Sequence, residues 1–147
     1  MEKLKKITIG GREIPLYYST YETAAIQEEI GCTAFQLRDQ VFGIRQADED
    51  DPESIVFDIV DDPEKIRKFG KLIAILGNAG LEEAGEKPDL TEKWILRKIK
   101  PGMLLIYAVA IMGVIYEGNM IEAQKEEQQG PVDEGLEAEQ AKKQPGN

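Results

Sequence analysis

The chain has 147 residues, and its 18 basic and 28 acidic side chains give a formal net charge of -10. It contains no histidine and one cysteine, which excludes histidine-dependent catalysis and His-containing zinc sites, an intrachain disulfide and a CxxC pair. We expect the single thiol, Cys32, to be reduced and inert in the core. Such an acidic chain also repels nucleic acid unless its charges are strongly segregated. Its length fits one small domain.

Two short alternating segments open the chain, at residues 6–9 and 12–18. Apolar and polar side chains alternate in both, and Gly10 and Gly11 between them allow the positive φ angles of a tight turn. The pattern therefore predicts a β-hairpin. Because an isolated hairpin is only marginally stable in water, its apolar side chains must pack against other elements. These side chains are Ile7, Ile9, Ile14 and Leu16.

A helix is expected over residues 20–30, because Ser19 and Glu22 match a capping box at its start and Gly31 follows its end. Thr33 can then cap a second short helix, which would form an αα-hairpin with the first. The apolar side chains on one face of this second helix are Ala34, Leu37, Val41 and Ile44.

The middle of the chain is acidic over residues 47–62. Its β-branched stretch, residues 55–60, fits either a short strand or the first turns of a helix, and the spacing alone does not decide between them. Asp62 followed by Pro63 is a clear helix start. The apolar spacing that follows predicts a helix that ends at the small residues 77–80.

Two further helices are expected. Thr91 or Asp89 caps a short one that Pro101 and Gly102 interrupt. Pro101 can begin the last helix, which extends to about Gly118.

The remaining residues, 121–147, are charged and almost free of large apolar side chains, so they cannot bury enough surface to offset their ordering entropy. We therefore predict a mainly α fold. Residues 1–120 form a small helical bundle with an N-terminal β-hairpin, and residues 121–147 form a flexible, disordered acidic tail.

No motif for catalysis, metal binding or cofactor binding is complete. The acidic cluster that begins at Asp48 has Glu53 where a calcium loop needs glycine and Ile59 where it needs glutamate. Gly70 and Lys71 lie inside a helical pattern rather than in a phosphate-binding loop, and Gly70 is expected to permit close helix contact. We therefore expect no enzyme activity, no metal and no cofactor.

The most informative segment is the apolar run at residues 103–116, which has no polar face when it is drawn as a helix. Such a helix is expected to be buried on every side, as the central helix of a small bundle. Alternatively, a second copy or a client protein covers one of its faces, for which methionine and tyrosine are well suited. A third possibility is a peripheral membrane helix, since the run is shorter than the about 20 residues that span a bilayer. The candidate partner-binding residues are Leu105, Val109, Met112, Tyr116 and Met120.

With these elements in order, the chain resembles the tail assembly chaperones of long-tailed bacteriophages, which are encoded just upstream of the tape measure protein. The likeness begins with ITIGGREIPLYYSTYETAAIQEEIG and continues through the short second helix to Phe42 and the helix at 63–79. It ends with the connection PDLTEKWI, the final apolar helix and its charged tail. It covers most of residues 5–120.

The resemblance implies a cytoplasmic, non-enzymatic protein that binds the tape measure protein, helps to recruit tail tube subunits and often forms homo-oligomers. Members of that family are often made in two lengths, and this chain would match the shorter form. We expect neither nucleic acid nor a membrane as a partner. The alternative function is that of a small structural or adaptor protein of a phage or mobile element that stays in its complex.

Overall fold

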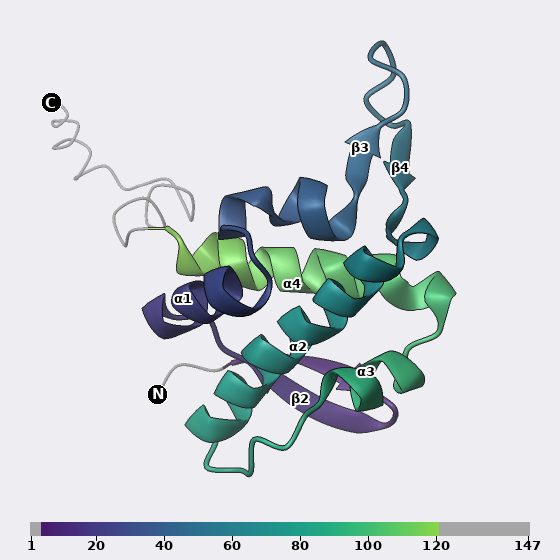
Figure 1. Cartoon of the computed structure of the whole chain (residues 1–147). Coiled ribbons are helices and arrows are strands. Elements are labelled where there is room, and N and C mark those ends of the chain that lie inside the picture. The colour runs from purple at the N-terminus through teal and green to yellow at the C-terminus, as the bar shows by residue number, and fades with distance from the viewer. Residues whose placement is uncertain (1–3, 121–147) are drawn as a thin grey trace, which may run out of the picture. The chain divides into compact units, whose positions relative to one another are not determined.

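The structure is a computed structural model, and it describes residues 4–120 (Figure 1). The predicted tail at residues 121–147 lies outside the described residues. Helices make up most of the elements, so the prediction of a mainly α fold is confirmed. In chain order the elements are β1 Lys5–Ile9, β2 Arg12–Leu16, α1 Thr20–Glu29, the 3₁₀ turn η1 Ala34–Gln36, the π-helical turn η2 Arg38–Phe42, β3 Ile44–Gln46, β4 Ile55–Phe57, the 3₁₀ turn η3 Ile59–Asp61, α2 Pro63–Glu83, α3 Glu92–Lys98, the 3₁₀ turn η4 Pro101–Met103 and α4 Leu104–Gly118.

Contacts divide the chain into two units, Met1–Ile115 and Tyr116–Asn147. The first unit contains every described element up to the last turn of α4. It also contains the hydrophobic core of the described residues, which draws side chains from the strands β1 and β2 and from all four α-helices.

The hairpin formed by β1 and β2 is an antiparallel pair in which Ile7 lies opposite Ile14. Gly10 and Gly11 form its turn with φ angles of 58° and 79°, a conformation that side chains with a Cβ rarely adopt. One face of the pair packs against α2 (Figure 1). The four side chains that were predicted to need cover, Ile7, Ile9, Ile14 and Leu16, are all buried.

Helix α1 begins with the predicted capping box, in which the Ser19 hydroxyl accepts from the Tyr21 amide and Glu22 accepts from the Ser19 amide. The second segment differs from its prediction as a regular helix. It consists of the 3₁₀ turn η1 and the π-helical turn η2, and it ends at Gly43 with a left-handed φ of 62°. The π-helical turn buries the consecutive side chains Val41 and Phe42, and Ile44 then begins a strand instead of ending a helix.

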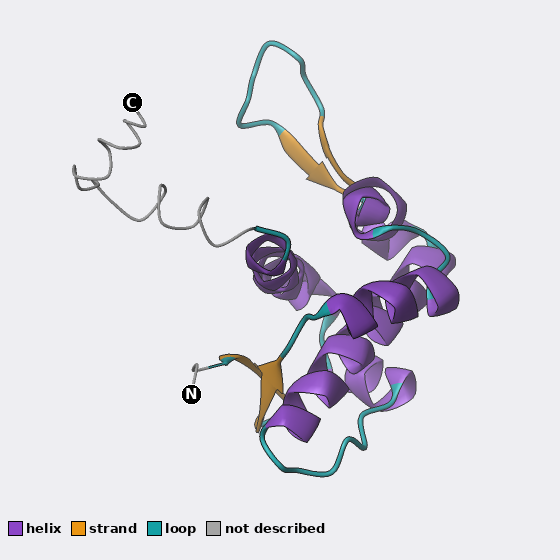
Figure 2. Cartoon of the chain, turned by 90° about the vertical axis from the view of Figure 1, so that its left-hand side faces the viewer, coloured by secondary structure: helices purple, strands orange, loops and turns teal. Residues whose placement is uncertain are grey.

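The stretch that fits either a strand or a helix contains both. Ile55–Phe57 is strand β4, which pairs antiparallel with β3, and the 3₁₀ turn η3 follows it. The loop at residues 47–54 joins the two strands, and together they form an arm that extends away from the helices (Figure 2).

Helix α2 starts with Asp62 as its cap, as predicted, but it does not end at residues 77–80; it continues to Glu83. Gly77 and Gly80 lie inside the helix, where they allow another element to approach closely. A Cβ on Gly80 would lie 2.0 Å from the carbonyl oxygen of Pro15 in β2. These glycines therefore set the distance between helix and hairpin, and the helix ends where the chain reaches Gly85, whose φ is 78°.

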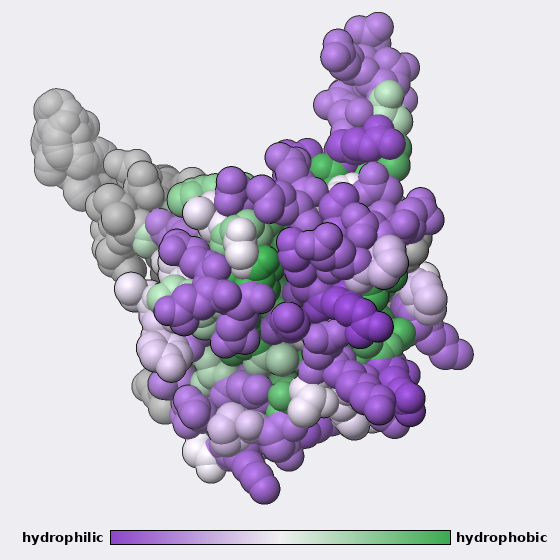
Figure 3. Space-filling view, in the orientation of Figure 1, coloured by the Kyte–Doolittle hydropathy of each residue, from purple (hydrophilic) through white to green (hydrophobic). Residues whose placement is uncertain are grey.

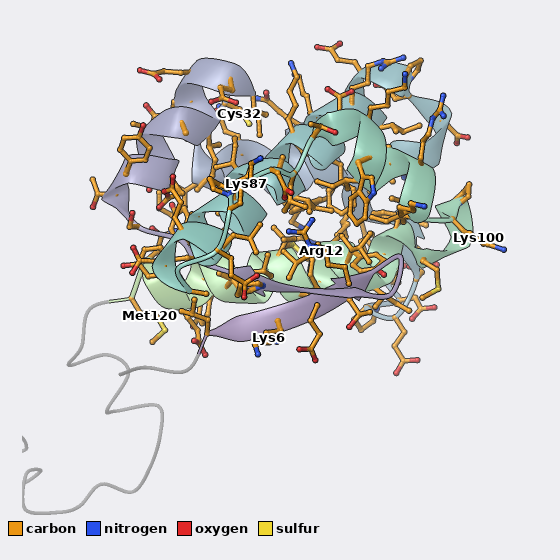
Figure 4. The ribbon with its side chains drawn as sticks, turned by 90° about the horizontal axis from the view of Figure 1, so that it is seen from below. Lys6, Arg12, Cys32, Lys87, Lys100 and Met120 are labelled. Carbon is orange, nitrogen blue, oxygen red and sulfur yellow. The ribbon has the colours of Figure 1, made fainter. Side chains whose placement is uncertain are left out.

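Helix α3 is capped by Thr91, whose hydroxyl accepts from the Trp94 amide. It packs on α2 at Gly70, where an added Cβ would lie 2.8 Å from Cγ of Leu96, so the predicted close helix contact is confirmed. Arg12 of the hairpin ties this region together, because it donates to Asp89 at 3.0 Å and places its guanidinium 6.0 Å from the Trp94 ring centre (Figure 4).

Helix α4 is buried on one side only, so the expectation that it is buried on every side is wrong. Its buried residues recur at the spacing of a single helical stripe: Leu104, Ala108, Ile111 and Ile115. The physical reason is the small number of elements available. The buried stripe of α4 belongs to the core that it shares with the hairpin and the other helices, and no described element lies over its opposite side.

Candidate functional site

Helix α4 is held in place by its buried stripe and by one polar contact at its edge. The stripe belongs to the same core as the hairpin and α2. The hydroxyl of Tyr107 donates to the carbonyl oxygen of Thr8 in β1, 2.5 Å away. Because core packing and this hydrogen bond fix the rotation of the helix about its axis, the face opposite the stripe is presented to solvent.

That opposite face is apolar. We define the α4 outer face as Leu105, Ile106 and Val109, whose exposed fractions are 39%, 59% and 57%. Gly113 continues it, with no atom within 4 Å of the position a Cβ would take. The sequence has no charged residue from Pro101 to Tyr116. Adjacent exposed apolar residues on a rigid helix are typical of a surface that a partner covers.

The five predicted partner-binding residues lie in different settings. Leu105 and Val109 belong to the α4 outer face, whereas Met112 is half-buried and packs against the core. Tyr116, which is 58% exposed, and the half-buried Met120 lie in the second unit.

Sequence reasoning missed Ile106, which has the largest exposed fraction of the α4 outer face. The signal was present in the spacing. Ile106 stands half a helical turn from the stripe that contains Leu104 and Ala108, so choosing that stripe as the buried one would have pointed to Ile106 as exposed.

The nucleophilic side chains considered in the sequence have structural settings in the described residues. Ser19 acts as a helix cap, and the Ser54 hydroxyl donates to backbone carbonyl oxygens of the arm loop. Cys32 is buried, and that burial raises the pKa of its thiol, while the nearby Lys68 opposes the shift to a smaller extent. Within residues 4–120, no group of three or more Cys, Asp or Glu side chains is arranged to hold a metal ion.

Among the residues that the structure describes, one helix is long and apolar enough to cross a membrane by length and composition, namely the segment Pro101–Gly118 with a mean hydropathy of 1.6. About 22% of this segment is buried inside the protein. The buried residues form the stripe described above, and they are part of the core that α2 and the hairpin share. Insertion into a bilayer would therefore remove one wall of that core.

Comparison with known proteins gives no relative: no family model, no curated protein and no solved structure matches this chain.

Proposed function

We propose that this protein is a tail assembly chaperone of a long-tailed phage or prophage, which acts without catalysis in the cytoplasm of the host bacterium. Its main client is the tape measure protein, and it helps to recruit tail tube subunits. The proposal includes the finer architecture predicted from the sequence, a small helical bundle followed by a flexible acidic tail. The observation that carries it is the α4 outer face, an apolar surface on a well-packed domain.

The physical match is between an apolar helix face and an apolar helical client. A tape measure protein is long and helical, so it offers repeated apolar stripes that need cover before the tail tube encloses them. An amphipathic helix can lay such a stripe along Leu105, Ile106 and Val109, in the manner of helix recognition by apolar surfaces. The net charge of -10 keeps the loaded complex soluble.

The burial of one side of α4 favours a protein client over a lipid bilayer. A helix that serves a membrane is free to expose every side, but Leu104, Ala108 and Ile111 are core residues of this domain. A protein client needs only the outer face and leaves the core intact.

The test is binding of the tape measure protein that the proposal expects to be encoded downstream of this gene, measured by calorimetry and by size-exclusion chromatography after co-expression. Val109→Asp places a charge in the α4 outer face and should weaken binding at least about tenfold, which corresponds to ~1.4 kcal/mol. Far-UV circular dichroism should be unchanged, because the Val109 side chain is exposed.

The matched control is Phe35→Asp, which introduces the same charge at a large apolar residue that is 86% exposed and lies in η1. It should bind like the wild type. Equal binding by wild type and Val109→Asp would rule out the α4 outer face as the client site. Failure of the wild type to bind, together with sedimentation on liposomes, would replace the chaperone proposal by a membrane role.

The alternative function, that of a structural or adaptor protein of a phage or mobile element, differs in whether the protein remains in the finished particle. A chaperone leaves before the particle is finished, so immunoblots of purified particles should lack it. Its presence at a fixed copy number in finished particles would support the structural role instead.

A further inference from the structure

A second surface with a distinct character lies between α2 and α3. It is an open cleft of about 750 Å³. Its apolar floor is formed by Pro63, Ile66 and Leu96, and the cationic side chains that line it are Arg67, Lys93 and Arg97. None of these residues belongs to α4, so this cleft is separate from the surface proposed for the client.

The cleft has an excess of positive charge in a strongly acidic protein. Arg67 forms an ion pair with Glu92 at 3.3 Å. Lys93 and Arg97, which lie one helical turn apart on α3, form no ion pair with any residue that the structure describes. Two adjacent unpaired cations raise the local positive potential, and an acidic group that reached both would relieve their repulsion.

The arm between β3 and β4 carries the complementary charge. Its loop has five carboxylates and no basic residue, and the sequence from Gln46 to Glu64 has no Lys or Arg at all. No ion pair to the loop carboxylates exists among residues 4–120. Figure 3 shows the arm as a hydrophilic projection. The five carboxylates belong to Asp48, Glu49, Asp50, Asp51 and Glu53.

The side chains of Gln46 and Ser54, at the two ends of this loop, form hydrogen bonds with its backbone. The Gln46 amide donates to the carbonyl oxygens of Asp48 and Asp51, each at 3.1 Å. The Ser54 hydroxyl donates to Asp51 at 2.7 Å and accepts from the Asp48 amide at 2.9 Å. An ordered loop loses less conformational entropy when it binds than a mobile one does.

We propose that the arm of one copy of this protein docks in the α2–α3 cleft of a second copy. The loop carboxylates approach Lys93 and Arg97, and the exposed Ile55, where strand β4 meets the loop, adds apolar surface for the floor. Because arm and cleft are different surfaces of the same chain, two copies can exchange arms in a closed pair, or the contact can repeat from copy to copy in a ring or an open linear assembly.

The chemistry of the cleft favours this occupant over a nucleic acid. A phosphate backbone would leave the apolar floor of Pro63, Ile66 and Leu96 unused. The arm supplies carboxylates and an apolar residue together. Contacts between exposed charges are screened by salt, so the association should be strongest at low ionic strength.

Sedimentation velocity of the full chain tests the proposal. The wild type should show a sedimentation coefficient that rises with concentration in low salt and returns to the monomer value in about 0.5 M NaCl. Two variants reverse the charges on either side of the contact: the arm variant carries Glu49→Lys, Asp50→Lys and Glu53→Lys, and the cleft variant carries Lys93→Glu and Arg97→Glu. Each alone should stay monomeric, and an equimolar mixture of the two should assemble at a concentration at least about tenfold lower than either alone.

The control variant carries Glu28→Lys, Glu83→Lys and Glu86→Lys, three exposed positions outside the arm and cleft. Like the arm variant, it loses three negative charges and gains three positive ones, which changes the net charge from -10 to -4. A net charge of smaller magnitude by itself favours association, so the control should assemble at least as well as the wild type. Loss of assembly in the arm variant but not in the control therefore reports the specific contact.

Three outcomes would overturn the proposal: a wild type that stays monomeric in low salt, a mixture of reversed variants that fails to assemble, or reversed variants that assemble individually. Specific binding of RNA to the cleft without self-association would likewise replace it. The readout needs no client protein and does not depend on the proposed function. Val109→Asp should still assemble through arm and cleft, so failure of the client proposal is distinguishable from failure of this one.

Discussion

Position 80 has no room for a side chain, because a Cβ there would lie 2.0 Å from the Pro15 carbonyl oxygen and 2.9 Å from the Leu16 amide nitrogen. Both of these are backbone atoms of the hairpin and cannot move aside as a flexible side chain can. Gly80→Ala should therefore lower the free energy of unfolding by about 1–3 kcal/mol, as other overpacked core sites do. Urea denaturation followed by circular dichroism measures this change.

Gly113 provides the opposite case within the same experiment. It lies in α4 with nothing within 4 Å of its missing Cβ. Gly113→Ala should raise the free energy of unfolding by about 0.5–1 kcal/mol, because alanine favours the helix and restricts the unfolded chain. Two glycine substitutions that shift stability in the same direction would contradict the packing described for Gly80.

Cys32 should be protected from thiol reagents in the folded protein. Its side chain is only 4% exposed, and burial raises the pKa of the thiol, so little reactive thiolate is present near pH 8. Modification by a chromogenic disulfide reagent should be slow in buffer and complete within the mixing time in denaturing urea. Rapid labelling under native conditions would show that this part of the core opens readily.

Some residue roles could be predicted from sequence and others could not. Ser19 and Glu22 act within one turn of helix, so their spacing alone identified the cap. Gly77 and Gly80 were misread as a helix stop, because glycine is typical both of helix ends and of close packing. Only the position of Pro15, far away in sequence, shows which role applies here.

At the scale of elements, the two sides of α4 should respond differently to truncation. Ile111 is fully buried and Val109 is 57% exposed, although both are β-branched residues of the same helix. Ile111→Ala should cost about 2–5 kcal/mol of unfolding free energy, whereas Val109→Ala should change it by no more than about 0.5 kcal/mol. Chemical denaturation of both variants measures the difference, and similar losses would show that the outer face is covered.

The same helix shows the limit of pattern reading for elements. Apolar spacing predicted a helix with no polar face, but it did not distinguish the buried stripe of Leu104, Ala108 and Ile111 from the other faces. Whether the remaining faces are covered depends on how many other elements reach them, which spacing does not encode. The turns η1 and η2 were missed for a related reason, since the need to bury both Val41 and Phe42 comes from the core and not from local preference.

At the scale of the whole molecule, the shared core predicts one cooperative unfolding transition for residues 4–115. Trp94, the only tryptophan, packs partly buried against a core that includes the hairpin and α4. Its fluorescence and the far-UV circular dichroism should therefore follow the same urea curve. An earlier fluorescence change would mean that the contact between Arg12 and Trp94 breaks before the helices unfold.

Charge distribution is the property of the whole molecule that composition conceals. The net charge of -10 predicted that polyanions are unfavourable partners, and it says nothing of where the cations lie. Folding brings Arg67 of α2 beside Lys93 and Arg97 of α3. Arg67 is separated from both of them by more than twenty positions in the sequence. A cluster of this kind can be found only when the packing of two helices is known.

The two edges of the hairpin have a consequence for solubility during folding. A two-stranded sheet has only edge strands, and a bare edge can add strands from other molecules and grow into fibrils. Here Leu76 of α2 accepts a hydrogen bond from the Tyr17 amide just beyond β2, while Tyr107 donates to Thr8 of β1 on the other side. Lys5 and Lys6 place charge at the start of β1. Contacts with the helices thus hinder the addition of further strands to the hairpin edges, and the protein is most prone to amyloid-like growth before α4 docks.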